Sequence, residues 1–282
     1  MRVIPSGKSL GAEVTGVNLS EDVSDTVVSL IIEAWRSHLV LIFRDQSLTD
    51  DILVSFSARL GELDPPAPNP YGRLIYPAYP ELNVISNIVE DGKPVGNLGS
   101  GEAVWHADMT YKEVPPKGAV LYAVELPAFG GDTYFANMQM AYNSLPAVEK
   151  QRIENKRAIH DASMNSAGMR RKDFDVISDV RETPGATHPL VRKDSQTGRK
   201  SLFLGRRPNS YVLGLPVSDS EQLLDGLWAH ATQSAFVFRH HWSMGDVLIW
   251  DNLSVLHRRD EFDGSDRRRL HRAQLKGDGP IE

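Results

Sequence analysis

The sequence predicts a mainly β protein with a few helical additions, arranged as an antiparallel sandwich or a jelly roll. Short runs rich in aliphatic and β-branched residues recur between turn-forming residues along most of the chain. Helical spacing of apolar residues is confined to three segments. With 282 residues, of which 41% are hydrophobic and 24% charged, the chain is long enough to bury a substantial core.

The N-terminal part is predicted to contain two helices that flank a strand. Apolar periodicity predicts a helix over residues 22–36, and the short apolar run at residues 39–43 is typical of a buried strand. Thr49 can cap a second helix, because its hydroxyl can accept a bond from a free backbone N–H group. That helix is expected to end at Gly61.

Most of the remaining chain is predicted as strands, interrupted by one amphipathic helix over residues 218–233. The alternating pattern of these runs suits antiparallel sheets. The expected strands are residues 82–86, 104–110, 119–125, 133–136, 202–204, 236–239, 246–251 and 268–276.

Two segments, residues 64–101 and 161–188, are rich in turn-forming residues and are predicted as long loops. Long loops in a compact domain are usually functional or disordered. The first leads directly into the expected strand at residues 104–110, so we expect both to border one active-site mouth, with plain surface loops as the alternative. Residues 1–282 are expected to form a single domain.

A His-x-Asp triplet, His106-Ala107-Asp108, precedes a third potential ligand, His257, far downstream. On a strand, the side chains of residues 106 and 108 would project to the same face. Two ligands from one strand and a third from a remote strand fit the 2-His-1-carboxylate arrangement of a mononuclear iron site. For the triplet alone, a hydrogen-bonded His–Asp pair at a strand edge is the more ordinary interpretation.

Two arginines that follow His257 favour the metal site. Arg268 and Arg272 are separated by an even number of positions, so on a strand they share one face. A guanidinium beside a metal suits bidentate binding of a carboxylate. The sequence therefore predicts a metal centre with cationic side chains next to it.

An ordered set of motifs resembles the taurine dioxygenase-like (TauD/TfdA) family of Fe(II)/2-oxoglutarate-dependent dioxygenases. The resemblance runs from about residue 10 to residue 277, and several motifs in order are more specific than one. The family folds as a double-stranded β-helix, a cupin-like jelly roll with helical additions, which the resemblance implies here. The matching stretches are residues 10–19, 104–111, 130–133, 188–191 with 197–200, 245–252 and 267–272.

The resemblance implies that His106, Asp108 and His257 hold Fe(II), with 2-oxoglutarate and O2 as co-substrates. Arg268 and Thr133 would bind the distal carboxylate of 2-oxoglutarate. The implied reaction decarboxylates 2-oxoglutarate to succinate and CO2 and oxidises, most simply hydroxylates, a C–H bond of a small organic acid.

Two positions bear on the primary substrate. Arg272 matches the family residue that anchors an acidic group of the substrate, with a strand salt bridge as the alternative. Glu102 stands where taurine dioxygenase itself has an amide, so we expect it to contact substrate, with a solvated loop acid as the alternative. Residues 64–72 also lack the histidine that helps that enzyme hold a sulfonate. We therefore expect a substrate other than taurine, and a zwitterionic acid would suit Glu102.

Composition excludes several kinds of site and argues against several kinds of partner. The absence of cysteine excludes disulfides, zinc–thiolate sites and cysteine nucleophiles, and a net charge of −6 gives no electrostatic reason to expect nucleic acid. No stretch approaches the roughly 20 apolar residues that cross a bilayer, and the N-terminus lacks the apolar core of a signal peptide. We expect a cytoplasmic protein whose partner is a small-molecule acid. Members of the family commonly associate, so a homo-oligomer remains open.

Two other functions are compatible with a jelly roll. A binding or regulatory protein could keep a vestigial metal site, although the intact ligand set together with Arg268 argues against this. A cupin-like Zn(II) hydrolase would also use three protein ligands but needs no arginine for a co-substrate. Metal content and succinate release in the presence of 2-oxoglutarate separate these possibilities.

Overall fold

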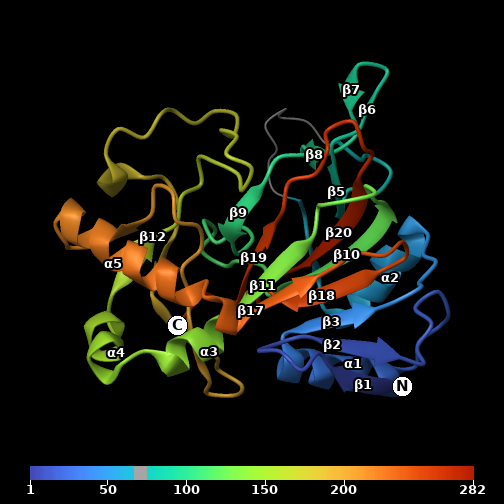
Figure 1. The fold of residues 1–282 in the computed structure, drawn as a ribbon, viewed down its shortest axis with the longest axis horizontal. Helices are drawn as coiled ribbons and strands as arrows, with labels where there is room; N and C mark the ends of the chain where they lie inside the picture. The colour runs from blue at the N-terminus through green and yellow to red at the C-terminus, as the bar shows by residue number, and fades with distance from the viewer. Residues whose placement is uncertain (67–74) are drawn as a thin grey trace.

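Two β-sheets, of nine and four strands, face one another in the computed structural model, which describes residues 1–66 and 75–282 (Figure 1). Side chains of both sheets share one buried apolar cluster, to which Leu121 belongs from the large sheet and Phe135 from the small one. The predicted mainly β sandwich with helical additions is therefore confirmed.

The large sheet forms the right-hand part of the molecule in Figure 1. Its strands are β1 (Arg2–Pro5), β2 (Ala12–Thr15), β3 (Val40–Phe43), β4 (Leu63–Asp64), β5 (Leu82–Ser86), β8 (Asn97–Leu98), β10 (Gly118–Glu125), β18 (Val247–Asp251) and β20 (Arg269–Leu275). Their order is β1-β2-β3-β18-β10-β20-β5-β8, with β4 paired to β20. All these pairs are antiparallel except β2–β3 and β5–β8.

The small sheet carries two of the candidate metal ligands. Its order is β17-β11-β19-β9. The strands are β9 (Ala103–His106), β11 (Thr133–Asn137), β17 (Val237–His240) and β19 (Val255–Arg259). Since β19 lies between β11 and β9, its backbone is hydrogen-bonded on both sides.

Alternation of side chains along the strands decides which residues face the space between the sheets. In β10, Val120 packs on the side of the helices, whereas Ala119 and Leu121 belong to the cluster between the sheets. In β19, Val255 belongs to that same inner cluster. His257, two residues further along the strand, therefore also points between the sheets.

Two helices, α1 (Asp25–His38) and α2 (Asp50–Leu60), cover the outer face of the large sheet and share its buried cluster. Side-chain caps start both, because Ser24 and Thr49 accept bonds from backbone N–H groups of the first turn. Both predicted helices are confirmed. The apolar periodicity of the first helix also predicts that Leu30 lies on its buried face, and this is wrong, since Leu30 is exposed.

A second layer packs on the side of the small sheet, at the left of Figure 1. It contains α3 (Met138–Ser144), α4 (Ala147–Ile153), α5 (Val217–Ala231), the single 3-10 turns η1 (Val180–Glu182) and η2 (Ser234–Phe236), and the short strands β12 (Arg157–Ile159), β13 (Thr187–Pro189), β14 (Val191–Lys193), β15 (Lys200–Leu202) and β16 (Tyr211–Val212). The predicted helix at residues 218–233 is confirmed as α5, with four apolar side chains buried as expected: Leu223, Leu224, Leu227 and Trp228.

Some sequence predictions need correction. The strand expected at residues 104–110 ends at His106, so Asp108 is not on a strand. The strand expected at residues 202–204 is displaced to β15. Within the segment expected as the first long loop, the predicted strand at residues 82–86 is confirmed as β5, but the segment also contains β8 and the hairpin of β6 (Val89–Glu90) and β7 (Lys93–Pro94), which were not predicted. Part of that segment, residues 67–74, lies outside the described residues.

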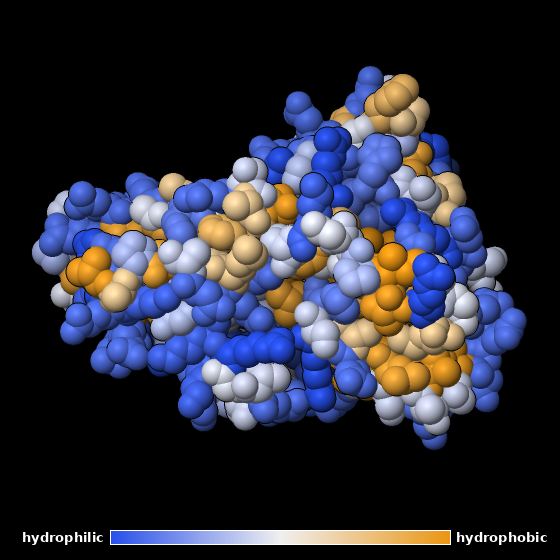
Figure 2. All heavy atoms as spheres, turned by 60° about the horizontal axis from the view of Figure 1, so that its bottom comes forward, coloured by the Kyte–Doolittle hydropathy of each residue, from blue (hydrophilic) through white to orange (hydrophobic). Residues whose placement is uncertain are grey.

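The surface is mostly polar, although hydrophobic side chains gather on the right-hand side of the face shown in Figure 2. In the described part of the chain, no helix combines the length and the apolar character needed to cross a bilayer.

Substitution of two glycines by alanine should have opposite effects on stability. An added Cβ at Gly118 would overlap the Trp35 ring and lie 2.8 Å from the carbonyl oxygen of Trp250, so Gly118→Ala should lower the free energy of unfolding by about 1–3 kcal/mol. Gly226 is exposed in α5 with no atom within 4 Å of an added Cβ. Gly226→Ala should therefore raise the free energy of unfolding by about 0.5–1 kcal/mol. Urea unfolding measures both, and a shift of the same sign would contradict this packing.

Candidate metal centre and active site

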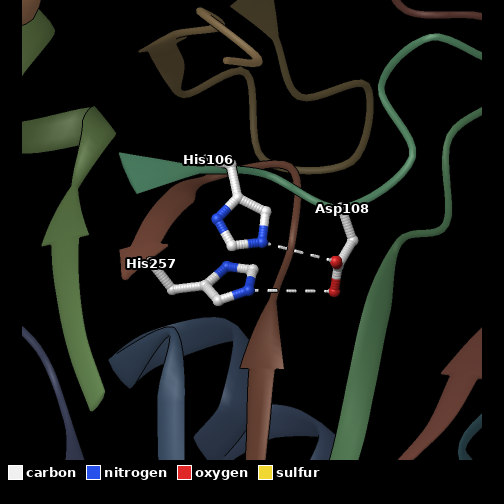
Figure 3. Close-up of side chains that lie close together, drawn as sticks. All are labelled: His106, Asp108 and His257. Carbon is white, nitrogen blue, oxygen red and sulfur yellow. Dashed lines mark ion pairs between the residues drawn. The ribbon is translucent and has the colours of Figure 1, made fainter. Parts of the chain in front are cut away.

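Three buried side chains from distant parts of the chain meet at one point between the sheets (Figure 3). His106 ends β9 and pairs directly with His257 of β19, so their rings lie 4.1 Å apart between centroids. The Nε2 atoms of His106 and His257 lie 3.7 and 3.9 Å from the two carboxylate oxygens of Asp108. All three potential ligand atoms lie within 4.8 Å of one another, a spacing that a single metal ion can bridge.

Asp108 reaches this point through a turn and not through strand alternation. Its backbone N–H donates to Oδ1 of Asn252 at 2.7 Å, and Nδ2 of Asn252 donates to the Asp108 carbonyl at 2.9 Å. The next residue, Met109, has a φ of 51°, which turns the chain away from β9. Asn252 ends the 245–252 motif but was given no role from the sequence. It is buried and fixes the backbone of the predicted carboxylate ligand.

The protonation states suit metal binding. Nδ1 of His106 lies 2.7 Å from the Val104 carbonyl oxygen, which can only accept, so Nδ1 carries the proton and Nε2 offers its lone pair. Burial lowers the pKa of His106, and it lowers the pKa of His257 well below its usual range. Burial would raise the pKa of Asp108, but the Arg272 guanidinium and both imidazoles outweigh this and hold it below its usual value. Neutral imidazoles and an ionised carboxylate are the forms that bind a metal.

Arg272 contacts Asp108, one of the three predicted metal ligands. Its Nη1 donates to both carboxylate oxygens of Asp108, at 3.0 and 2.8 Å. The alternative interpretation of Arg272, a salt bridge with an acid, is therefore present in the structure, with Asp108 as the acid. Arg272 also borders both cavities next to the centre. A substrate contact would have to use donors other than Nη1.

The first cavity adjoins both histidines and holds a buried cation. Thr133, Arg259 and Arg268 line it together with His106 and His257. Arg268 is only 2% exposed. Within the described residues it donates to the Gly131 carbonyl at 3.2 Å but has no carboxylate at ion-pair distance, and its Nε has no partner. Burial lowers its pKa well below the usual range. A buried guanidinium without a counter-ion fits a site for a ligand carboxylate.

Thr133 begins β11 and lines the same cavity as Arg268. Its Oγ1 accepts a bond from the indole N–H of Trp242 at 3.0 Å. Because this bond occupies a lone pair of the hydroxyl and not its proton, the Thr133 O–H group remains free to donate to a carboxylate. The sequence gave Trp242 no role.

Arg259 is a second cation in this cavity that sequence reasoning missed. It lies two residues after His257 on β19 and donates to the backbone carbonyls of Leu98 and Gly101. Burial lowers its pKa to about 10. The sequence spacing could have found Arg259, because residues two positions apart on a strand share a face, and Arg259 is two positions from the predicted ligand His257.

A second cavity lies on the Asp108 side of the centre. Both segments predicted as loops contribute to its wall, the first through Asn83 and Asn97 and the second through Asp161 and Arg171. Its lining also includes His106, Asp108, Tyr111, Arg206 and Arg272.

Glu102 lies outside both cavities. Its side chain is 55% exposed and accepts a bond from Arg258 at 3.2 Å. This is the environment of the solvated loop acid that was the alternative for this position. We therefore leave Glu102 out of the proposed site, because its carboxylate does not line the space next to the predicted ligands.

We predict that Asn252→Ala weakens metal binding, because it removes both bonds that fix the Asp108 backbone. Loss of a residue that orients a ligand typically lowers metal affinity about 10- to 100-fold. Titration of the protein with Mn(II) measures the effect.

Asn137→Ala is the matched control for Asn252→Ala. Asn137 caps α3 and bonds the Ser9 carbonyl, but it lines neither cavity. Its loss should lower the free energy of unfolding by about 1 kcal/mol and leave Mn(II) affinity unchanged. Equal Mn(II) affinity in Asn252→Ala and the wild type would show that Asn252 does not position the ligand.

Comparison with known proteins identifies the family of this chain. Residues 2–274 match the sequence model described as "Taurine catabolism dioxygenase TauD, TfdA family". The chain is 37% identical over 279 residues to the alpha-ketoglutarate-dependent 2,4-dichlorophenoxyacetate dioxygenase of Cupriavidus pinatubonensis, covering 96% of each protein. It is 32% identical to the (S)-phenoxypropionate/alpha-ketoglutarate-dioxygenase of Sphingobium herbicidovorans, covering 99% of this chain and 96% of that one.

Solved structures show the same fold. AAD-2 in complex with Mn(II) and N-oxalylglycine aligns with a TM-score of 0.82 and 28% identity over the full length of both chains. A putative alpha-ketoglutarate-dependent taurine dioxygenase from Burkholderia xenovorans aligns with a TM-score of 0.79 and 31% identity, over 99% of this chain and 90% of that one. The predicted jelly-roll core is confirmed. The chain belongs to the TauD/TfdA family and is an Fe(II)- and 2-oxoglutarate-dependent (alpha-ketoglutarate-dependent) dioxygenase.

Proposed function

We propose that His106, Asp108 and His257 hold the Fe(II) of this dioxygenase and that its primary substrate is a small organic anion. In the reaction, substrate R–H, O2 and 2-oxoglutarate give R–OH, succinate and CO2. The observation that carries the proposal is the buried guanidinium of Arg268, which shares a cavity with two of the three ligands and has no carboxylate partner within the described residues.

The residues of the first cavity fit 2-oxoglutarate. Fe(II), 2-oxoglutarate and O2 supply the oxidising chemistry when bound. Arg268 would pair with the distal carboxylate, and the free O–H group of Thr133 would add a donor to it. Arg259 adds a second positive charge to the same wall. N-oxalylglycine, the ligand of the structural neighbour AAD-2, differs from 2-oxoglutarate by an N–H group in place of a methylene.

The second cavity is proposed for the primary substrate. Its wall contains three arginines, Arg171, Arg206 and Arg272, against the carboxylates Asp108 and Asp161. An excess of positive charge favours an anion. Relatives are named for anionic substrates, among them 2,4-dichlorophenoxyacetate and sulfate esters. The zwitterion expected from Glu102 is not retained, because that carboxylate lies outside the cavity.

We also propose that residues 64–101 and 161–188 act as active-site loops of a single domain spanning residues 1–282. Both segments supply side chains to the wall of the second cavity. Loops positioned by a rigid scaffold are where enzymes commonly carry substrate contacts.

Arg268→Gln should raise the KM for 2-oxoglutarate about 10- to 100-fold, because it removes a buried charge-assisted bond to the co-substrate. Arg267→Gln is the matched control. Arg267 is the neighbouring arginine, is exposed and pairs with Glu125, so its loss should change that KM little. Succinate release with Fe(II) and 2-oxoglutarate is the assay. Equal KM values for both variants would remove Arg268 from the co-substrate site.

A library of small acids identifies the substrate class. Wild-type enzyme is incubated with Fe(II), 2-oxoglutarate and each carboxylate, sulfonate or sulfate ester in turn, and substrate-dependent succinate release is measured. We expect stimulation by organic anions and not by their neutral analogues. Stimulation by neutral compounds alone would contradict the proposed substrate class.

A further inference from the structure

One of the three arginines in the second cavity has no counter-ion among residues 1–66 and 75–282. Arg206 donates to Asp161 at 2.6 Å, and Arg272 donates to Asp108. Within the described residues, Arg171 has no carboxylate at ion-pair distance, and the one hydrogen bond of its guanidinium runs from Nη1 to the Ala162 carbonyl at 2.7 Å. Since a guanidinium carries five N–H donors, most of those of Arg171 are left for a ligand.

Asp161, a buried acid that lines the same cavity, cannot serve Arg171, because its acceptors are already used. Oδ1 of Asp161 accepts bonds from the backbone N–H and the hydroxyl of Ser163, both at 2.6 Å. Oδ2 accepts from Arg206 at 2.6 Å and from Asn209 at 3.0 Å. The charge of Arg171 therefore stays unpaired although an acid lies in the same cavity wall.

Arg171 is held in place without a carboxylate. Its guanidinium carbon lies 4.2 Å from the centre of the Tyr111 ring, a cation–π contact. Its backbone N–H donates to the Ser163 carbonyl at 2.8 Å. The Tyr111 hydroxyl lines the same cavity, is buried and has no protein partner within the described residues. A fixed cation thus lies beside a second unpaired donor.

The segment that carries Arg171 is joined to β9, the strand that ends at His106. The backbone N–H of Val104 in β9 donates to the Ser166 carbonyl at 3.0 Å. His106 also forms an isolated β-bridge with Arg206. Arg206 in turn donates to Asp161 of the segment that carries Arg171. These contacts fix the segment relative to the proposed metal centre, so an anion held by Arg171 would be held at a set position beside it.

We infer that Arg171 binds the carboxylate of the primary substrate, while Arg272, which the sequence predicted for this role, holds Asp108. This inference rests on the proposed function, because it assigns the second cavity to the primary substrate. The planar fork of a guanidinium matches a carboxylate with two parallel bonds, which would orient the substrate as well as bind it.

Binding of matched acid and amide pairs tests this assignment. The enzyme is loaded with Mn(II) and N-oxalylglycine, and isothermal titration calorimetry measures the affinity for phenoxyacetate, 2-phenoxypropionate and 2,4-dichlorophenoxyacetate, each beside its neutral amide. We expect the wild type to bind at least one acid about tenfold or more tightly than its amide, as for a hydrogen bond to a charged group. Arg171→Gln should reduce this preference to less than about threefold.

Arg170→Gln is the matched control, since Arg170 is the exposed neighbour and the charge change is the same. It should keep the preference for acids. An undiminished preference in Arg171→Gln, or a wild type that binds no acid more tightly than its amide, would overturn the inference. N-oxalylglycine binding, measured first, separates the two proposals. If the wild type does not bind N-oxalylglycine, the proposed co-substrate site is contradicted. If the wild type binds N-oxalylglycine but shows no preference for acids over amides, only the role of Arg171 is contradicted.

Discussion

The register between β9 and β19 is the constraint on which the site depends. His106 and His257 are direct partners across this strand pair, and both point between the sheets. A shift of one residue in β19 would turn His257 to the opposite face and remove it from the centre. Pairing of β19 with β11 on its other edge, across five residues, opposes such a shift. The positions of the two histidines are thus a property of the sheet, whereas the position of Asp108 depends on its bonds to Asn252.

The second feature that shapes the site is positive charge without a carboxylate partner in the described residues. The chain carries a net charge of −6, yet Arg171, Arg259 and Arg268 lie beside the centre without a carboxylate partner in the described residues. Burying a charge without a counter-ion is unfavourable, so these residues destabilise the empty protein. An anionic ligand supplies the missing partner and would stabilise the folded state in proportion to its affinity. The unpaired arginines thus lower the stability of the ligand-free protein at the positions where they could bind an anion.

The scaffold and the loops have different tasks. The sheets place the histidines and Arg268 on strands or at their ends, where the backbone is fixed by neighbouring strands. The wall of the second cavity comes largely from the segments between strands. Relatives in this family are named for phenoxyacetates, phenoxypropionates and sulfate esters. Such variety is expected when loops carry the substrate contacts and the sheets carry the chemistry.

The sequence by itself determined the fold class, three helices and the Thr49 cap of one of them, because strand alternation, helical periodicity and capping residues are local patterns. It also indicated the potential metal ligands, because the motifs that contain them occur in order along the chain. It placed Asp108 on the strand of His106, where the structure has a turn fixed by Asn252, since that bond joins residues far apart in the chain. It likewise assigned the acidic group of the substrate to Arg272 and gave Arg171 no role. Only the packed structure shows that Arg272 is paired with Asp108. It also shows that Asp161 has no acceptor left for Arg171. Which charges are neutralised depends on the distances between remote side chains, and these are decided when the sheets and loops pack together.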